Sequence, residues 1–134
     1  MIHAYKSESD ITREICDYLQ SCNYFFWRCN NIPVFGRAMP KYAARGLPDI
    51  CILWRGVFIG IEVKRPSSDM REANGRKVRE GTLSKFQDEF GAKIMFNDGE
   101  YHMVKSLDQA IGVLQGISIR RAFDLPKPSY GKIK

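Results

Sequence analysis

The stretch DICILWRGVFIGIEVK, residues 49 to 64, contains two apolar, β-branched runs separated by Arg55-Gly56. A two-residue turn between two such runs predicts a β-hairpin. If the turn is centred on Arg55 and Gly56, the numbers of opposed residues add up to the same sum along the hairpin. Asp49 then faces Glu62 at the open end.

The open end of this hairpin combines charged and apolar residues in a regular pattern. Residues two apart in a strand point to the same face, so Glu62 and Lys64 project together while Ile61 and Val63 project to the other side. Asp49, opposite Glu62, would have its Cβ about 5 Å from the Cβ of that glutamate. Two carboxylates so placed repel each other, and a divalent cation between them would offset the repulsion.

The residue types at this end suit Mg²⁺, which takes a few carboxylates, a carbonyl and water, and leaves positions for phosphate oxygens. Asp49 and Glu62 would supply the carboxylates, and the backbone carbonyl of Val63 a third ligand. Lys64 would orient or deprotonate the attacking water and stabilise charge developing on phosphorus. The alternative is a surface cluster in which Lys64 pairs with a neighbouring carboxylate, and the spacing alone leaves both interpretations open.

The rest of the chain predicts further elements around the hairpin. Apolar residues at helical spacing predict an amphipathic helix over 8–22, with Ser7 or Ser9 as its N-cap and Glu14 at the margin of its apolar stripe. The other predicted elements are a strand over 24–29, a long loop over 30–48, a short helix over 84–91, a second hairpin from AKIMFND and EYHMVKS, and a closing helix over 106–117.

Length and composition predict one globular domain over residues 1–123 and a basic tail over 124–134. The longest apolar runs, ICILW and VFIGI, are too short to cross a bilayer, and the first residues lack an apolar signal region. We therefore expect a cytoplasmic protein, in a bacterial cell or a virus-infected host cell. The four cysteines lack a close C-x-x-C pair and are expected to be reduced thiols buried in the core rather than a zinc site.

Positive charge flanks the hairpin in the sequence. The net charge is +6, and the loop before Asp49 carries Arg37, Lys41 and Arg45 without an acidic residue. Arg76 and Lys77 follow the hairpin in a second basic segment. Such segments fit contacts with the phosphates of DNA, although charged stretches are also common on ordinary solvated surfaces.

Three motifs in order resemble the VRR-Nuc family of the PD-(D/E)XK nuclease superfamily. They are GLPD at 46–49, IEVK at 61–64 and GTLSKFQ at 81–87. E-x-K alone is a weak signal, whereas the ordered set with a hairpin-sized gap and a Leu-Ser-x-x-Gln helix start is much more specific. The resemblance implies an α/β fold with a restriction-endonuclease-like core, a mixed sheet of about four strands flanked by helices.

The resemblance also implies functions for individual residues. Asp49 and Glu62 match the metal-binding carboxylates, Lys64 the catalytic lysine, and Gln87 the glutamine that positions the lysine and the phosphate. Glu14 is similar to the first-helix glutamate that completes the metal site, with Glu8 in the same segment as the alternative. Members of the family cleave DNA with Mg²⁺ or Mn²⁺, and small members resemble homodimers that cut branched DNA such as four-way junctions.

Other interpretations remain open from the sequence. A non-catalytic nucleic-acid-binding module would keep the fold and the basic loops, and a structural subunit would use the same charges as surface ion pairs. His3 and His102 have no ligand-like partner nearby in the sequence. Phe25, Phe26 and Trp27 are expected in the core rather than as platforms for stacked bases.

Overall fold

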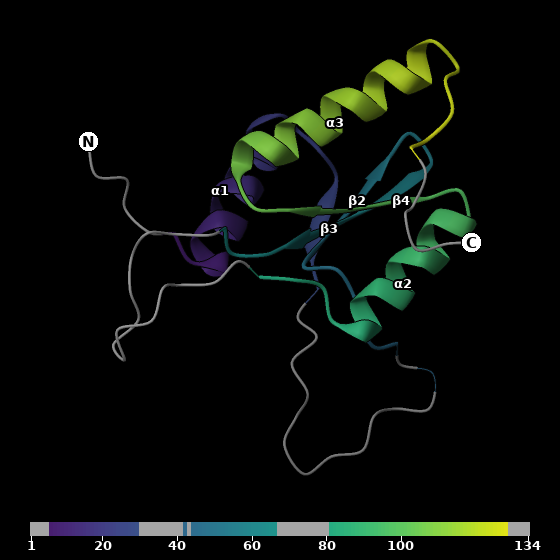
Figure 1. Cartoon of the computed structure of the whole chain (residues 1–134). Helices are drawn as coiled ribbons and strands as arrows, with labels where there is room; N and C mark the ends of the chain where they lie inside the picture. Colours follow the sequence, from purple (N-terminus) through teal and green to yellow (C-terminus); the bar gives the residue numbers. More distant parts are fainter. Residues whose placement is uncertain (1–5, 30–41, 43, 67–80, 129–134) are drawn as a thin grey trace, which may run out of the picture.

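The computed structural model describes residues 6–29, 42, 44–66 and 81–128. It has an α/β architecture in which one four-stranded mixed sheet, in the order β1-β2-β3-β4, is flanked by three helices (Figure 1). The elements in chain order are α1 (Glu8–Ser21), β1 (Phe26–Arg28), β2 (Ile50–Trp54), β3 (Val57–Val63), α2 (Lys85–Phe96), β4 (Glu100–Val104) and α3 (Leu107–Ala122).

The predicted hairpin and its register are confirmed. β2 pairs antiparallel with β3. Trp54 lies opposite Val57 at the turn, and the predicted register continues to Ile50 opposite Ile61. Arg55 and Gly56 have φ values of 48° and 81°. Positive φ at both central residues is the mark of the type I′ turn, whose twist matches that of the two strands. Asp49 and Glu62 therefore lie just beyond the last pair, at the open end.

The region after Ser84 corrects the prediction. A helix that ends at Gly91 and a second hairpin after it are both wrong, because α2 continues to Phe96 and β4 pairs in parallel with β3. A Cβ at Gly91 would lie 2.4 Å from Cδ1 of Tyr101. The glycine thus permits close contact between α2 and β4 and does not end the helix.

The two faces of the sheet are covered by different helices. Buried residues of α1 and α3 pack against Ile59 and Ile61 of β3. The alternate residue Gly60 lies on the other face, together with Tyr101, which contacts α2. Figure 1 shows α3 on one side of the sheet and α2 on the other. The charged residues Glu62 and Lys64 share the α2 face with Gly60.

Part of the α2 face is exposed, which corrects the prediction for two aromatic residues. Phe25 and Trp27 were expected in the core but are 66% and 41% exposed, whereas Phe26 packs against the core. Their rings lie 5.7 Å apart, and Trp27 also contacts Phe58 of β3 at 6.3 Å. α2 packs over β3 and β4, so side chains of β1 on this face remain open to solvent.

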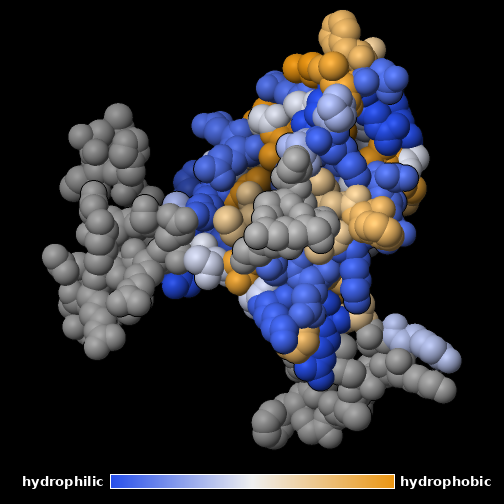
Figure 2. Space-filling model, turned by 45° about the vertical axis from the view of Figure 1, so that its right-hand side comes forward, coloured by the Kyte–Doolittle hydropathy of each residue, from blue (hydrophilic) through white to orange (hydrophobic). Residues whose placement is uncertain are grey.

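The last helix, predicted to end at 117, continues to Ala122. Phe123 is the C-cap of α3, and beyond it the Nζ of Lys127 donates to the carbonyls of Met95 and Gly99. Figure 2 shows hydrophobic residues gathered where α3 ends, with hydrophilic residues over much of the same face. In the part of the chain that the structure describes, no helix is long and apolar enough to cross a bilayer.

Candidate active site

Asp49 and Glu62 meet at the open end of the hairpin. Asp49 precedes β2, and its Oδ2 accepts a hydrogen bond of 2.7 Å from the backbone N–H of Val63. In an extended strand the N–H and C=O of one residue point to the same side, so the carbonyl of Val63 is directed toward Asp49 as well. The arrangement places a carboxylate and a backbone carbonyl beside Glu62.

Glu62 is a buried acidic side chain, only 2% exposed. Its Oε1 accepts a hydrogen bond of 2.5 Å from Nε2 of Gln87 and lies 3.6 Å from Nζ of Lys64. Its Oε2 is buried and has no hydrogen-bond partner among the described residues. As carboxylates, Glu62 and Asp49 cannot donate to each other, so this oxygen needs a proton or a cation.

The electrostatics of the pair follow from its burial. Removal from water and the nearby charge of Asp49 raise the pKa of Glu62 from 4.5 to about 8, although Lys64 acts in the opposite direction. Burial also raises the pKa of Asp49, against the effect of the Val63 N–H. Both carboxyl groups are therefore harder to ionise than usual. A cation bound between them would stabilise the charged forms of both.

Gly46 and Pro48 of the GLPD motif each have a packing reason at this site. Gly46 has φ +79°, and a Cβ there would lie 2.2 Å from the carbonyl oxygen of Phe86 in the first turn of α2. Pro48 is buried against Gly60, whose absent side chain leaves room for the ring. The motif thus fixes the segment before Asp49 between α2 and β3.

Gln87 belongs both to the cap of α2 and to the site. Ser84 is the N-cap, and its Oγ accepts from the backbone N–H of Gln87. The Oε1 of Gln87 accepts in return from the backbone N–H of Ser84 at 2.8 Å, which completes a capping box. Its Nε2 is then directed to Glu62, so the cap orients the amide that holds the buried carboxylate.

Of the two glutamates considered in the first helix, the structure brings Glu8 rather than Glu14 to this region. Glu14 forms an ion pair of 3.0 Å with Lys6. Glu8 accepts a hydrogen bond of 3.2 Å from the backbone N–H of Arg65, and its charge raises the pKa of Asp49. Helical periodicity identified the margin of the apolar stripe but not which end of α1 reaches the hairpin.

The predicted DNA-binding residues are only partly placed. Arg37, Lys41, Arg76 and Lys77 lie outside the described residues, as does His3. The guanidinium carbon of Arg45 lies 5.1 Å from the centre of the Phe86 ring, and Arg45 is exposed. A positive charge therefore lies beside the first turn of α2, next to Gln87.

The candidate metal ligands form a partial set. Within the described ranges, no three His, Cys, Asp or Glu side chains form a group ready to hold a metal ion. Asp49, Glu62 and the Val63 carbonyl offer only oxygen ligands, as Mg²⁺ and Mn²⁺ prefer. The Oε2 of Glu62 has no hydrogen-bond partner among the described residues, so it is available to a cation. The residues present fit a divalent cation that keeps several waters or phosphate oxygens.

Other reactive side chains are engaged elsewhere. His102 Nε2 lies 3.0 Å from Oε1 of the buried Glu100, which also accepts from Arg120. The four cysteines are free, but only Cys51 is buried and Cys22 is exposed, so the prediction of core thiols is wrong for Cys22. The Sγ atoms of Cys29 and Cys51 lie 2.8 Å apart, and burial raises the pKa of the Cys51 thiol.

Comparisons with protein-family models, with curated proteins and with solved structures found no match to this chain. The resemblance to the VRR-Nuc family therefore rests on the motif residues, and the assignment to that family stays a prediction.

Proposed function

We propose that this protein is a divalent-metal-dependent DNA endonuclease of the PD-(D/E)XK type. The observation that carries the proposal is the half-buried Asp49 beside the buried Glu62, whose Oε2 has no hydrogen-bond partner among the described residues when both groups are ionised. Lys64 and Gln87 contact the other oxygen of Glu62. A buried glutamate beside a second carboxylate, both with raised pKa values, is costly to keep without a function, which favours a catalytic site over a surface ion cluster.

The cation would be held by Asp49, Glu62 and the carbonyl of Val63. When bound, Mg²⁺ or Mn²⁺ would supply positive charge for the scissile phosphate and make water more acidic. Neither Glu8 nor Glu14 is needed to define the core of this set. Glu8 accepts from the backbone N–H of Arg65, and its charge raises the pKa of Asp49, so it would influence the site without binding the cation.

The chain's own residues would then organise the hydrolysis. Water attacks phosphorus in line with the departing 3′ oxygen, so a phosphorus–oxygen bond forms as the bond to the 3′ oxygen breaks. The water loses a proton and the leaving oxygen gains one. Lys64, held near Glu62, would orient the water and stabilise negative charge on the phosphate. Gln87 would fix the position of Glu62 through its amide.

Two other functions fit the observations less well. A binding module without catalysis would attract phosphates by positive charge, and two neighbouring carboxylates oppose that attraction. A structural subunit would use charged residues as exposed ion pairs, whereas Glu62 is buried.

The substrate and assembly are proposed from the resemblance and from charge. Branched DNA, such as a four-way junction, is the proposed substrate, and a homodimer would place two sites for two cuts related by a two-fold axis. Arg45 beside α2 supports contact with phosphate near the site. Sedimentation of the chain with and without junction DNA tests the dimer, and a monomer in both conditions would rule it out.

The catalytic assignments are tested by separating binding from turnover. Asp49→Asn and Glu62→Gln should abolish cleavage of junction DNA, whereas Lys64→Ala should lose turnover but bind the junction as the native chain does. Lys93→Ala, which removes an exposed charge from the last turn of α2, serves as the control and should cleave normally. Unchanged cleavage by either carboxylate variant would remove that residue from the site.

A further inference from the structure

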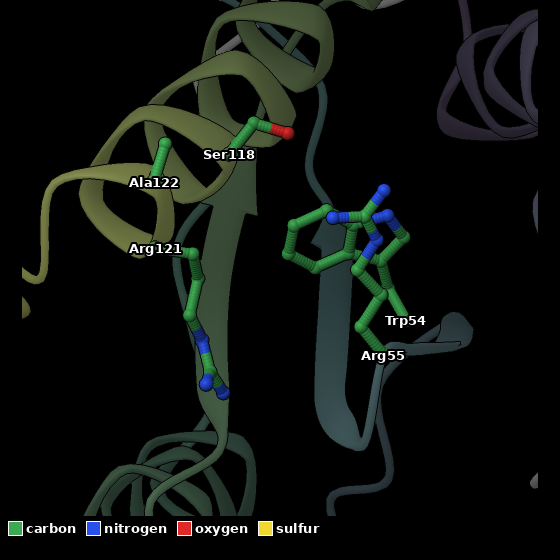
Figure 3. A pocket seen from close by; sticks show the side chains of 5 residues that line it. All are labelled: Trp54, Arg55, Ser118, Arg121 and Ala122. Atoms are coloured by element: carbon green, nitrogen blue, oxygen red, sulfur yellow. The ribbon is translucent and has the colours of Figure 1, made fainter.

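A pocket of about 500 Å³ lies at the turn of the hairpin, away from the candidate active site. Its described lining residues are Trp54, Arg55, Ser118, Arg121 and Ala122. Figure 3 shows Arg121 extending from α3 on one side and Trp54 with Arg55 on the hairpin opposite. We propose that this pocket binds a phosphate ester of a nucleotide unit, held by the two guanidinium groups.

The charge of the pocket supports an anionic ligand. Arg120 and Arg121 are neighbours in the last turn of α3, but Arg120 donates to the buried Glu100. Arg121 and Arg55 form no ion pair with a carboxylate among the described residues, and none of the described lining residues is acidic. Both arginines line one hollow, and two guanidinium groups without a carboxylate partner among the described residues suit the oxygens of a phosphate.

The conformation of Arg55 gives a second, independent reason. Arg55 has φ +48° in the type I′ turn, a position for which asparagine, aspartate and glycine are the favoured residues. Its guanidinium carbon lies 5.1 Å from the centre of the Trp54 ring. Stacking on the indole holds the charge in place while its N–H groups stay available, so little side-chain freedom is lost on binding.

One effect opposes an anion here, and the charges outweigh it. The end of α3 carries roughly half a negative charge from the helix dipole. Arg55 and Arg121 bring two full positive charges to the same hollow. The hydroxyl of Ser118, one turn before Ala122, adds a possible donor to the ligand.

The position of the pocket distinguishes its ligand from the scissile phosphate. Trp54 and Glu62 lie on opposite faces of the sheet, because their neighbours Ile52 and Gly60 do. The length of β3 from its first residue to Glu62 adds a separation of roughly 17 Å. A phosphate in this pocket is therefore a different one from a phosphate at the candidate active site, and its binding does not require the metal.

The test uses the tryptophan in the pocket as its reporter. The chain has two tryptophans, so Trp27→Phe leaves Trp54 as the sole source of indole fluorescence. The Trp27→Phe protein is titrated in EDTA with short single-stranded DNA, with a deoxynucleoside monophosphate and with inorganic phosphate. We expect saturable change in Trp54 emission. A response to the monophosphate at similar affinity would identify a free nucleotide as the ligand, and a response to DNA alone would identify a DNA strand.

Substitutions then link the response to the two arginines. Arg55→Asn and Arg121→Gln should each weaken the ligand's affinity about tenfold, as expected for loss of a charge-assisted hydrogen bond. For DNA, each should also reduce the salt slope by about one. Asparagine tolerates the positive φ at position 55, so Arg55→Asn should unfold no earlier than the native chain. Arg13→Gln on α1 removes the same charge away from the pocket and is the control.

Two results would overturn the proposal. One is the absence of any Trp54 response to all three probes, and the other is loss of affinity no greater than that of Arg13→Gln. Because the titration contains EDTA and measures no cleavage, failure here leaves the nuclease proposal intact. Likewise, a chain that never cleaves DNA would still show the binding.

Discussion

Without a bound metal, the protein should become less stable as the pH rises from about 4.5 to about 8. Glu62 has a pKa raised to about 8 by burial and by Asp49. Between its ordinary pKa of 4.5 and about 8, the folded chain keeps a proton on this group that the unfolded chain has lost. The folded state therefore binds more protons, and its free energy of unfolding falls as the pH increases. Asp49, whose pKa is also raised, adds in the same direction.

The size of this effect follows from the two pKa values. One pH unit is worth about 1.4 kcal/mol for one proton, so the interval from 4.5 to about 8 corresponds to roughly 5 kcal/mol at most. A domain of this length has a total stability of about 5–15 kcal/mol. The loss should lower the melting temperature by on the order of 10 °C.

Thermal unfolding of the native chain and of Glu62→Gln, in EDTA across this pH interval, measures the effect. Glutamine cannot ionise but can still accept from Gln87, so Glu62→Gln should lose most of the slope and be the more stable protein at pH 8. Glu89→Gln, at an exposed position of α2, should keep the native slope. Parallel slopes for the native chain and Glu62→Gln would refute the reasoning. Adding Mg²⁺ at pH 8 should restore stability to the native chain and leave Glu62→Gln unchanged.

Three further predictions follow from the described contacts. Gln87→Ala should reduce cleavage at least tenfold, because Glu62 loses the hydrogen bond that holds it. Gln109→Ala removes a similar capping contact from α3. It should affect only stability, by about 1 kcal/mol. Gly46→Ala should lower the unfolding free energy by about 2 kcal/mol or more through its clash with α2, while Gly112→Ala, where a Cβ meets open space in α3, should raise it by about 0.5–1 kcal/mol in denaturant titrations. Glu100→Ala should destabilise the fold by about 3 kcal/mol because it removes a buried carboxylate and leaves the half-buried Arg120 unpaired, and a loss below about 1 kcal/mol would contradict this.

The parts of the structure that local rules govern were predictable. The two-residue turn at Arg55-Gly56 fixes the register of the hairpin, and that register alone brings Asp49 to Glu62. Serine N-caps identified the start of α2 at Ser84, and Ser7 was one of the two candidate caps for α1. The site could be built from the sequence because nearly all of it comes from one hairpin and one helix start.

The parts that depend on contacts between distant elements were not predictable. Gly91 suggested a helix end, but its lack of a side chain leaves room for the ring of Tyr101. No local sequence pattern indicates this contact. The exposure of Trp27 depends on how far α2 covers the sheet. The choice between Glu8 and Glu14 depends on which end of α1 lies against the hairpin.

The central claim is tested most directly by cleavage of end-labelled four-way junction, splayed-arm and linear duplex DNA, with Mg²⁺, Mn²⁺ or EDTA. We predict cutting of branched DNA by the native chain with either metal, no cutting in EDTA, and no cutting by Lys64→Ala purified in the same way. Metal-dependent cutting that Lys64→Ala retains would assign the activity to a contaminant or to another site. Intact DNA in every reaction, with the junction still bound by the native chain, would contradict the nuclease proposal and favour a binding module.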